Sequence, residues 1–518
     1  MLQLILGRAG SGKTYTVYEE ITARVRAGER DILLLVPEQF SFESERTLLR
    51  RLGVQDAAAV QVLSFTRLAD TVARECGGFS GRLMDDVTRT LLMSRALAEV
   101  QDQLVLYRRH AARADYVKTV LDVVAECKQY AVTPHQLAEA AATLPAGTLR
   151  QKLTELSTVM EAYAALVADS YVDPADALTR LAEQLPESDM ARGASVFVDG
   201  FRGFTQQELA VLALVMRRAK SVTVTLCTDT LDTRDEYALF APVSRTAARF
   251  VRLARDNGVE VAAPRHLTEN HRAKAEALAV LEQGAFLPDA PAFPDATAAV
   301  TVAPLADRYA ECRTLARELR RLMREEGVRC RDVAVTARNL ADYRGILDTA
   351  LAAAGIPFYM DQREDVHSEP LVALVQSALR CVAGGWRAES VLQLMKTGLL
   401  GFSAPSIARM ENYIYTWKLN GRRLREEWTA NPEGFSVQVD DTTRRTLHYL
   451  NILRHRLVTP LARLGDTLHD PVSGLDFAKA VYRYLSDSQV PRLVRLQVRR
   501  LEAAGDPLAA GRMERLWE

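Results

Sequence analysis

A glycine-rich segment close to the N-terminus places the strongest constraint on how this chain folds. Residues 7–14 read GRAGSGKT, which satisfies the spacing G-x-x-x-x-G-K-[ST]. An apolar stretch at 2–6 precedes this segment, and a helical pattern from about Thr14 to Ala27 follows it. A strand, a glycine-rich loop and a helix in this order predict a phosphate-binding loop (P-loop) at the edge of a parallel sheet.

The loop predicts the contacts of a nucleoside triphosphate and Mg²⁺. Its backbone N–H groups are expected to surround the phosphates, and the positive end of the helix is expected to face them. Lys13 is expected to reach the β and γ phosphates, and the Thr14 hydroxyl is expected to hold Mg²⁺. A glycine turn that binds nothing is the less favoured interpretation. The candidate nucleotide-binding residues are Gly7, Arg8, Ala9, Gly10, Ser11, Gly12, Lys13 and Thr14.

A second magnesium ligand is expected at Asp199, which ends the apolar segment SVFVD. A carboxylate at the end of a neighbouring strand can hold Mg²⁺ through water, as the Walker B aspartate does. Hydrolysis also needs a base to activate water, and Gly200 stands where that second carboxylate is expected. Weak hydrolysis is therefore predicted. The alternative is that Asp199 only begins a turn before Gly200.

Composition limits the class of protein. A chain of 518 residues is too long for one hydrophobic core and predicts roughly three or four domains. The 66 basic and 66 acidic residues balance, so any contact with DNA must be local. Six scattered cysteines without a C-x-x-C pair predict neither a zinc site nor disulfides, and they fit the cytoplasm. No apolar run is long enough to predict a membrane span.

Apolar strand patterns and helical patterns alternate along the chain in blocks. Near-continuous apolar strands separated by helices predict doubly wound α/β domains, and long helical stretches interrupt them. The helical pattern still runs at the last residues, which predicts that the chain is part of a longer protein. The predicted domains are a P-loop domain at 1–80 and 194–283, a helical insertion at 81–193, a Pro and Ala rich linker at 284–299, the first part of a second α/β domain at 300–368 with strands at 300–304, 332–337 and 355–360, and a second helical domain at 369–518.

The order of these segments resembles the superfamily 1 DNA helicases. VPEQFSFESER (36–46), VLSFTRLA (62–69), VDGFRGFTQQE (198–208) and ENHR (269–272) stand where such helicases have motifs Ia, Ib, II and IV. The resemblance implies two RecA-like parallel-sheet domains, each with a helical insertion domain, in the arrangement 1A, 1B, 2A and 2B. It also implies that Arg272 contacts the γ phosphate.

Within that superfamily, GRAGSGKT at the N-terminus together with VPEQFSFESER and DGFRGFT resembles the AddB family, the second subunit of the bacterial AddAB helicase-nucleases. The resemblance implies an ATP-binding, helicase-like subunit that is not the motor and that acts in double-strand break repair by homologous recombination. It further implies recognition of the Chi hotspot sequence, with DNA and the motor and nuclease subunit AddA as partners. Full-length members carry a nuclease domain held by an iron–sulfur cluster, and this sequence contains neither that domain nor a cysteine cluster.

Contacts with single-stranded DNA are expected on segments that follow the predicted strands. Aromatic side chains there can stack on bases, while arginines follow the phosphates. For Phe42 and Phe65, packing into the core is the alternative. The candidate DNA-binding residues are Phe40, Phe42, Ser64, Phe65, Thr66 and Arg67.

Two other functions stay open at this point. One is an autonomous superfamily 1 helicase whose catalytic base has moved, for instance to Glu208. The other is a structural P-loop ATPase with no role on DNA. The choice between adenine and guanine is also open, because no glutamine-bearing segment stands before Gly7.

Overall fold

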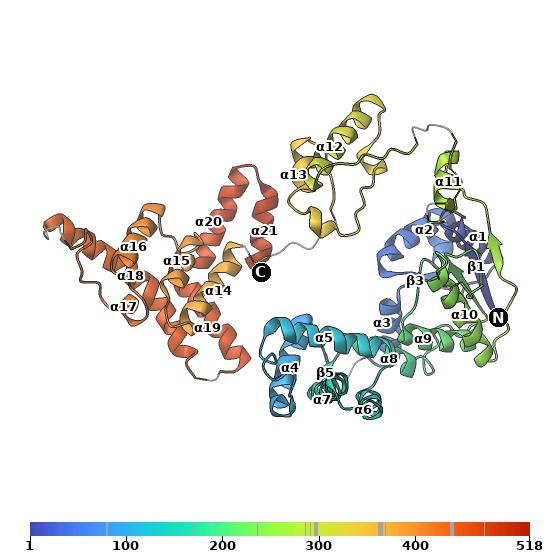
Figure 1. The fold of residues 1–518 in the computed structure, drawn as a ribbon, viewed down its shortest axis with the longest axis horizontal. Coiled ribbons are helices and arrows are strands. Elements are labelled where there is room, and N and C mark those ends of the chain that lie inside the picture. The colour runs from blue at the N-terminus through green and yellow to red at the C-terminus, as the bar shows by residue number, and fades with distance from the viewer. Residues whose placement is uncertain are drawn as a thin grey trace. The chain divides into compact units, whose positions relative to one another are not determined.

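The chain forms two compact units, Met1–Ala303 and Pro304–Glu518. The computed structural model describes residues 1–78, 81–168, 170–235, 237–284, 286–287, 289–290, 292–294, 299–360, 366–367, 369–435, 440–470 and 472–517 (Figure 1). Much of the predicted linker at 284–299 lies outside these residues. Among the described helices, none is long and apolar enough to cross a bilayer.

A parallel sheet forms the centre of the first unit. Within the described residues it has six strands in the order β3-β2-β6-β7-β1-β8, and every pairing is parallel. The carboxyl ends of parallel strands share one edge, which is where ligands bind in open α/β sheets. The strands are β1 (Leu2–Gly7), β2 (Ile32–Leu35), β3 (Val60–Leu63), β6 (Ser195–Val198), β7 (Ser221–Leu226) and β8 (Arg265–Leu267).

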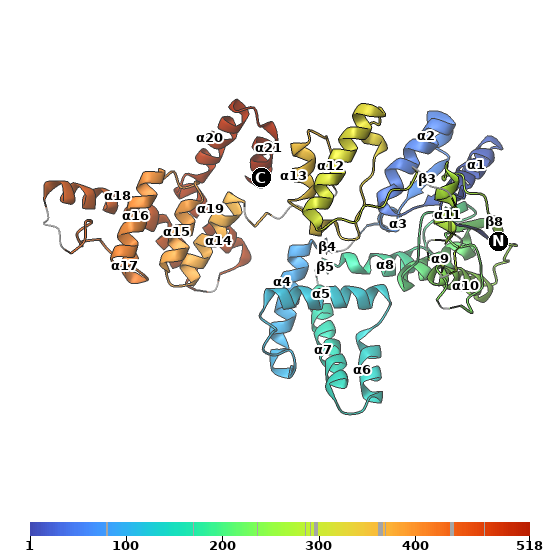
Figure 2. The same ribbon diagram turned by 45° about the horizontal axis from the view of Figure 1, so that its top comes forward.

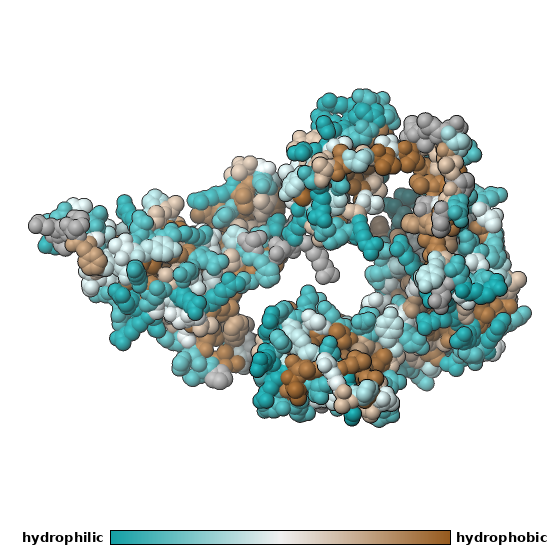
Figure 3. Space-filling model, in the orientation of Figure 1, coloured by the Kyte–Doolittle hydropathy of each residue, from teal (hydrophilic) through white to brown (hydrophobic). Residues whose placement is uncertain are grey.

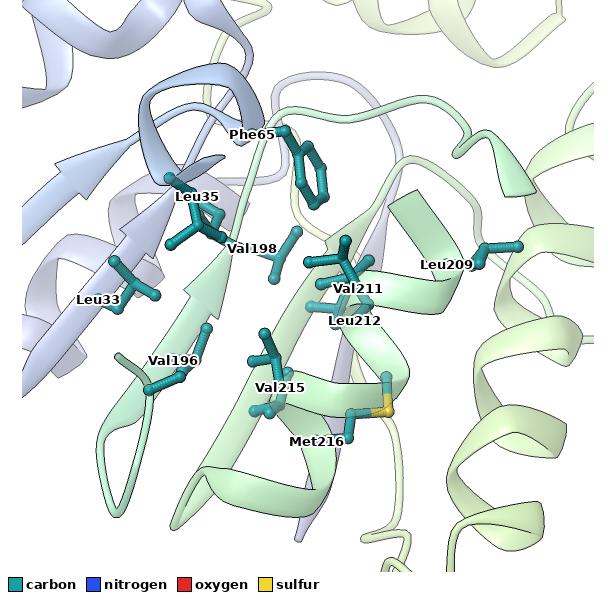
Figure 4. Packing of buried hydrophobic residues seen from close by; sticks show 14 of the residues in the cluster. Leu33, Leu35, Phe65, Val196, Val198, Leu209, Val211, Leu212, Val215 and Met216 are labelled. Carbon is teal, nitrogen blue, oxygen red and sulfur yellow. The ribbon is translucent and has the colours of Figure 1, made fainter. Parts of the chain in front are cut away.

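Helices cover both faces of this sheet, because alternate strand residues point to opposite faces. Leu33 and Leu35 join a buried cluster that also contains Val198, whereas Leu34 and Phe197 join a second cluster. Figure 4 shows the first cluster, with Phe65 and Leu212 beside the strands. The first cluster packs against α3 (Phe65–Glu75), α8 (Ala177–Gln184), α9 (Gln206–Arg218) and α10 (Ala241–Asp256), and the second against α1 (Lys13–Arg26) and α2 (Ser41–Ala57).

A mainly helical part interrupts the sheet between β3 and β6, as the sequence pattern predicts. It has its own buried cluster, which includes Leu97, Leu121 and Tyr163. A short parallel pair of strands, β4 (Arg82–Leu83) and β5 (Tyr171–Val172), also lies here and was not predicted. Its long helices are α4 (Asp86–Glu99), α5 (Ala114–Gln129), α6 (Pro134–Thr143) and α7 (Thr148–Ala168), of which α6 and α7 form a hairpin (Figure 2).

The second sheet that the sequence predicts is wrong for the described residues. The segments at 300–304, 332–337 and 355–360 contain no strand within the described part of the second unit. An apolar run forms a strand only where a neighbour supplies backbone hydrogen bonds. Here Val302 and Tyr359 are instead 86% and 90% exposed, and Figure 3 shows apolar surface on this part of the chain. Helices α12 (Arg308–Glu325) and α13 (Leu347–Ala353) pack together around Leu319 and Leu351.

Helices make up the rest of the second unit. They enclose one large cluster, in which Tyr413 stacks on Trp428 with ring centroids 4.7 Å apart. The helices are α14 (Pro370–Ala383), α15 (Ala388–Lys396), α16 (Ala404–Thr416), α17 (Arg422–Arg425), α18 (Asp441–Thr467), α19 (Gly474–Asp487), α20 (Val490–Ala503) and α21 (Pro507–Trp517).

Candidate nucleotide-binding site

The glycine-rich loop lies between β1 and α1, at the carboxyl edge of the sheet. Gly10 and Gly12 have φ angles of 82° and 84°, a left-handed conformation that favours glycine. Helix α1 begins at Lys13, and no side chain caps its N-terminus. The first N–H groups of this helix therefore lack a side-chain partner, which suits an anionic ligand.

Lys13 bends back over the loop. Its Nζ donates hydrogen bonds of 2.8 Å to the carbonyl oxygens of Gly7 and Arg8. Burial lowers the pKa of the Lys13 ammonium, and Arg272 lowers it further, while Cys227 and Asp199 act in the opposite direction. The ammonium is thus held by neutral carbonyl groups, which an anionic phosphate can replace as the stronger partner.

The predicted magnesium ligands meet. Thr14 Oγ1 donates a 2.8 Å hydrogen bond to Oδ2 of Asp199, whose side chain is buried at the end of β6. Thr225, on the neighbouring β7, donates its hydroxyl hydrogen to Oδ1 of the same carboxylate. The sequence analysis missed Thr225, although a buried threonine in the apolar strand VTVTL was a signal.

These residues fit a magnesium ion. Mg²⁺ prefers oxygen ligands, and the Thr14 hydroxyl and the Asp199 carboxylate lie together at the N-terminus of α1. Thr14 would hold the ion directly, and Asp199 would hold it through water. When bound, Mg²⁺ would neutralise part of the phosphate charge. No cluster of His, Cys, Asp and Glu suited to a metal was found elsewhere in the described residues.

The positions at which a catalytic base could stand are occupied in other ways. Gly200 has a φ of 84°, which a residue with a side chain adopts only with strain. Glu208 caps α9: its carboxylate accepts a 2.7 Å hydrogen bond from the backbone N–H of Thr205, and the Thr205 hydroxyl accepts one of 3.2 Å from the Glu208 N–H. A carboxylate used as a helix cap is a poor candidate for activating water.

The segment after β8 brings Arg272 to the loop, as predicted. The His271 N–H donates a 2.9 Å hydrogen bond to the Gly10 carbonyl. Oδ1 of Asn270 accepts hydrogen bonds of 3.0 Å from the backbone N–H groups of Arg272 and Ala273. A Cβ added to Gly10 would lie 2.8 Å from Cβ of Arg272, so only glycine fits there. Asn270 and His271 were not predicted, because their contact depends on β8 pairing with β1.

The other loop residues differ in their surroundings. Ala9 is exposed, whereas Ser11 is buried, and its hydroxyl has no hydrogen-bond partner among the described residues. Arg8 donates hydrogen bonds to Glu282 and Asp229. The backbone of Arg8 thus belongs to the loop, while its side chain is bound by carboxylates.

Two of the six candidate DNA contacts are buried. Phe65 is 6% exposed and makes edge-to-face contacts with Phe201 and Phe204, at centroid distances of 5.5 and 6.4 Å. Ser64 caps α3 by accepting a 3.2 Å hydrogen bond from the Arg67 N–H, and its hydroxyl also contacts Glu38. The predicted stacking of a base on Phe65 is therefore corrected, because core packing uses this ring.

The remaining candidates lie on the surface. Phe40 and Phe42 are 42% and 73% exposed, and the Arg46 guanidinium lies 5.9 Å from the centre of the Phe42 ring. Thr66 and Arg67 are also exposed, and Arg67 forms a 2.7 Å ion pair with Glu45. An exposed aromatic ring beside arginines can stack on a base and hold a phosphate.

Relatives with matching sequences fall in one group, the subunits of ATP-dependent helicase/deoxyribonucleases. The chain is 35% identical over 544 residues to such a subunit from Desulforudis audaxviator, and 32% identical over 541 residues to one from Geobacillus thermodenitrificans. Both alignments cover 100% of this chain and 46% of the relative. The chain thus spans about half the length of these relatives. A family described as "ADDB, N-terminal" matches residues 4–282, which contain the loop, Asp199 and Arg272. This match covers more than half of the chain, and the chain therefore belongs to the AddB family.

Proposed function

We propose that this chain is an ATP-binding, helicase-like subunit of an ATP-dependent helicase-nuclease complex that repairs double-strand breaks by homologous recombination. The observation that carries the proposal is the arrangement of Lys13, Thr14 and Asp199 on the loop. The wider role is supported by the relatives, whose names describe subunits of an ATP-dependent helicase/deoxyribonuclease.

The nucleotide has a defined place in this proposal. The backbone of residues 7–14 holds the phosphates, Lys13 leaves the Gly7 and Arg8 carbonyls for the β and γ phosphates, and Arg272 contacts the γ phosphate. Thr14 and Asp199 hold Mg²⁺. Each cationic group thereby stabilises bound phosphate, and none of them transfers a proton from water.

Weak intrinsic hydrolysis follows from the surroundings of Asp199. Its two carboxylate oxygens are bound by Thr14 and Thr225, and Glu208 caps α9. Among the described residues, no neighbouring carboxylate has been identified that could take the proton of the attacking water. We therefore propose that the chain binds ATP without being the motor of the complex.

DNA and a second subunit complete the proposal. The exposed Phe40, Phe42, Thr66 and Arg67 contact single-stranded DNA or duplex ends, and this surface contributes to the recognition of Chi. Because the relatives are named as subunits, their names support a heteromeric partner, which we propose to be the motor and nuclease subunit AddA. The six cysteines, all in described residues, are free, in keeping with the proposed cytoplasmic location.

Steady-state ATP hydrolysis tests this function against the alternative of an autonomous motor. The protein is assayed with Mg²⁺, with and without single-stranded DNA, beside Lys13→Ala. The proposal predicts negligible turnover in both cases, together with measurable binding of single-stranded DNA at low salt. Turnover of several per second that rises with DNA and vanishes in Lys13→Ala would establish a motor. A lack of affinity for DNA would favour the structural ATPase.

A further inference from the structure

Arg8 connects the phosphate-binding loop to the last helix of the first unit, α11 (Glu276–Gly284). Its Nε donates a 2.9 Å hydrogen bond to Oε1 of Glu282, and its Nη2 donates one of 2.7 Å to the Glu282 carbonyl. The guanidinium also lies 3.4 Å from a carboxylate oxygen of Asp229 and 5.2 Å from the centre of the Phe240 ring. One side chain of the loop thus holds two acidic residues from other segments.

Helix α11 has few other fixed contacts. Among its residues, all of them described, only the Ala277 side chain is buried, whereas Leu278 and Leu281 are 37% and 48% exposed. The side chains of Arg8 and Glu282 are each only 25% exposed, so water screens their ion pair less than it screens an open surface pair. The position of α11 on the sheet domain therefore depends strongly on Arg8.

The same residue also contacts the nucleotide-binding lysine. The carbonyl of Arg8 accepts a hydrogen bond from Lys13 Nζ, and Glu282 is close enough to raise the pKa of that lysine. A triphosphate next to Lys13 would repel the Glu282 carboxylate and compete with it for the Arg8 guanidinium. The bound nucleotide and the ion pair between Arg8 and Glu282 therefore oppose each other electrostatically.

We propose that Arg8 is a positioning residue that couples occupancy of the nucleotide site to the docking of α11. This coupling rests on the nucleotide binding proposed above. Without nucleotide, Arg8 holds Glu282 and α11 stays docked on the sheet domain. With nucleotide, the phosphates weaken this ion pair and α11 loosens. Since coupling is reciprocal, removing the Glu282 charge strengthens nucleotide binding.

Hydrogen–deuterium exchange of the backbone amides tests this coupling in the 518-residue protein. Peptides covering residues 7–26 and 276–284 are followed with and without a saturating, non-hydrolysable ATP analogue and Mg²⁺. In the unsubstituted protein, we expect the analogue to slow exchange in 7–26 and to speed exchange in 276–284 at least threefold. In Arg8→Ala, exchange in 276–284 is already fast and the analogue does not change it. Arg8→Lys, which keeps the charge, restores part of the protection.

Two variants complete the design. Arg26→Ala removes an exposed arginine at the far end of α1 and is expected to behave as the unsubstituted protein. Glu282→Gln is expected to bind the analogue at least threefold more tightly, which a merely structural role of Glu282 would not cause.

The outcomes separate this coupling from nucleotide binding itself. Slowed exchange in 7–26 with no change in 276–284 would overturn the coupling and leave the proposed function intact. Equal exchange of 276–284 in Arg8→Ala and in the unsubstituted protein would overturn it as well. If the analogue leaves 7–26 unprotected, the nucleotide site itself fails, and the coupling fails with it.

Discussion

The hydroxyl of Thr14 donates a hydrogen bond to Oδ2 of Asp199 across 2.8 Å, although 185 positions separate the two residues in the sequence. The bond joins the start of α1 to the end of β6. It forms because β7 alone lies between β6 and β1 in the sheet, and Thr225 of β7 binds the other carboxylate oxygen. The site for Mg²⁺ is therefore preorganised by strand order.

Asp199→Asn should weaken the contribution of Mg²⁺ to nucleotide binding. The amide keeps the size of the side chain but removes the charge that holds the ion. We expect affinity for an ATP analogue to fall at least about tenfold in Mg²⁺ and to change little in EDTA, since one pKd unit corresponds to about 1.4 kcal/mol. Fluorescence titrations in both buffers measure this effect. Asp232→Asn, in an exposed loop, is the control, and equal losses in both buffers would contradict the assignment.

Phe42→Ala should weaken binding of single-stranded DNA without loss of stability. The ring is 73% exposed, so its removal should change the free energy of unfolding by less than about 0.5 kcal/mol. Loss of one stacked base costs about 1–3 kcal/mol, which is roughly a 5- to 150-fold weaker Kd. Fluorescence anisotropy with a labelled oligonucleotide at low salt measures the change. Leu49→Ala, on an exposed position of the same helix, should bind DNA normally, and an unchanged Kd for Phe42→Ala would exclude stacking.

Phe65→Ala should have the opposite profile. Because this ring packs against Phe201 and Phe204 in the core, its removal should lower the free energy of unfolding by about 3–5 kcal/mol. Urea unfolding followed by circular dichroism measures the loss. A variant as stable as the unsubstituted protein, with weaker DNA binding, would restore the predicted role of Phe65 on DNA.

Acid should destabilise the helical part of the first unit through Asp173. Burial raises the pKa of this carboxyl, but Lys128 at 2.7 Å and Arg89 at 3.2 Å act against burial, and the net pKa is lowered. A lowered pKa gives stability that is present above the unfolded pKa, about 3.9, and is lost as pH falls below it. Urea unfolding at pH 7, 5 and 3.5 should show this loss, and Asp173→Asn should reduce the difference between pH 5 and 3.5. An unchanged difference would exclude Asp173 as its source.

The sequence predicts the phosphate-binding loop well because the loop is local: its eight residues are contiguous, and glycine spacing sets their backbone conformation. Contacts that depend on strand order were harder to predict. Thr225, Asn270 and Glu282 reach the loop from distant segments, and the pattern of apolar residues in a single sequence does not say which strands pair. Asp199 was predicted because a carboxylate after an apolar strand is a local signal.

Two predictions failed because sequence patterns do not report burial or pairing. An aromatic residue just after a strand can face either solvent or the core, and Phe65 enters the core whereas Phe42 stays exposed. The apolar runs at 300–304, 332–337 and 355–360 have the composition of strands, yet the described residues contain no pairing partner for them. The arrangement of a second RecA-like domain with its own helical insertion therefore stays a prediction.

Equilibrium titration of the protein with a fluorescent ATP analogue in Mg²⁺ tests the central claim most directly. The claim is that the loop binds nucleotide through Lys13, whose ammonium the Gly7 and Arg8 carbonyls now hold. We predict saturable one-site binding that weakens at least about 100-fold, or about 2.7 kcal/mol, in Lys13→Ala. Circular dichroism should show that this variant stays folded. Equal affinity of the two proteins, or no saturable binding by the unsubstituted protein, would contradict the account.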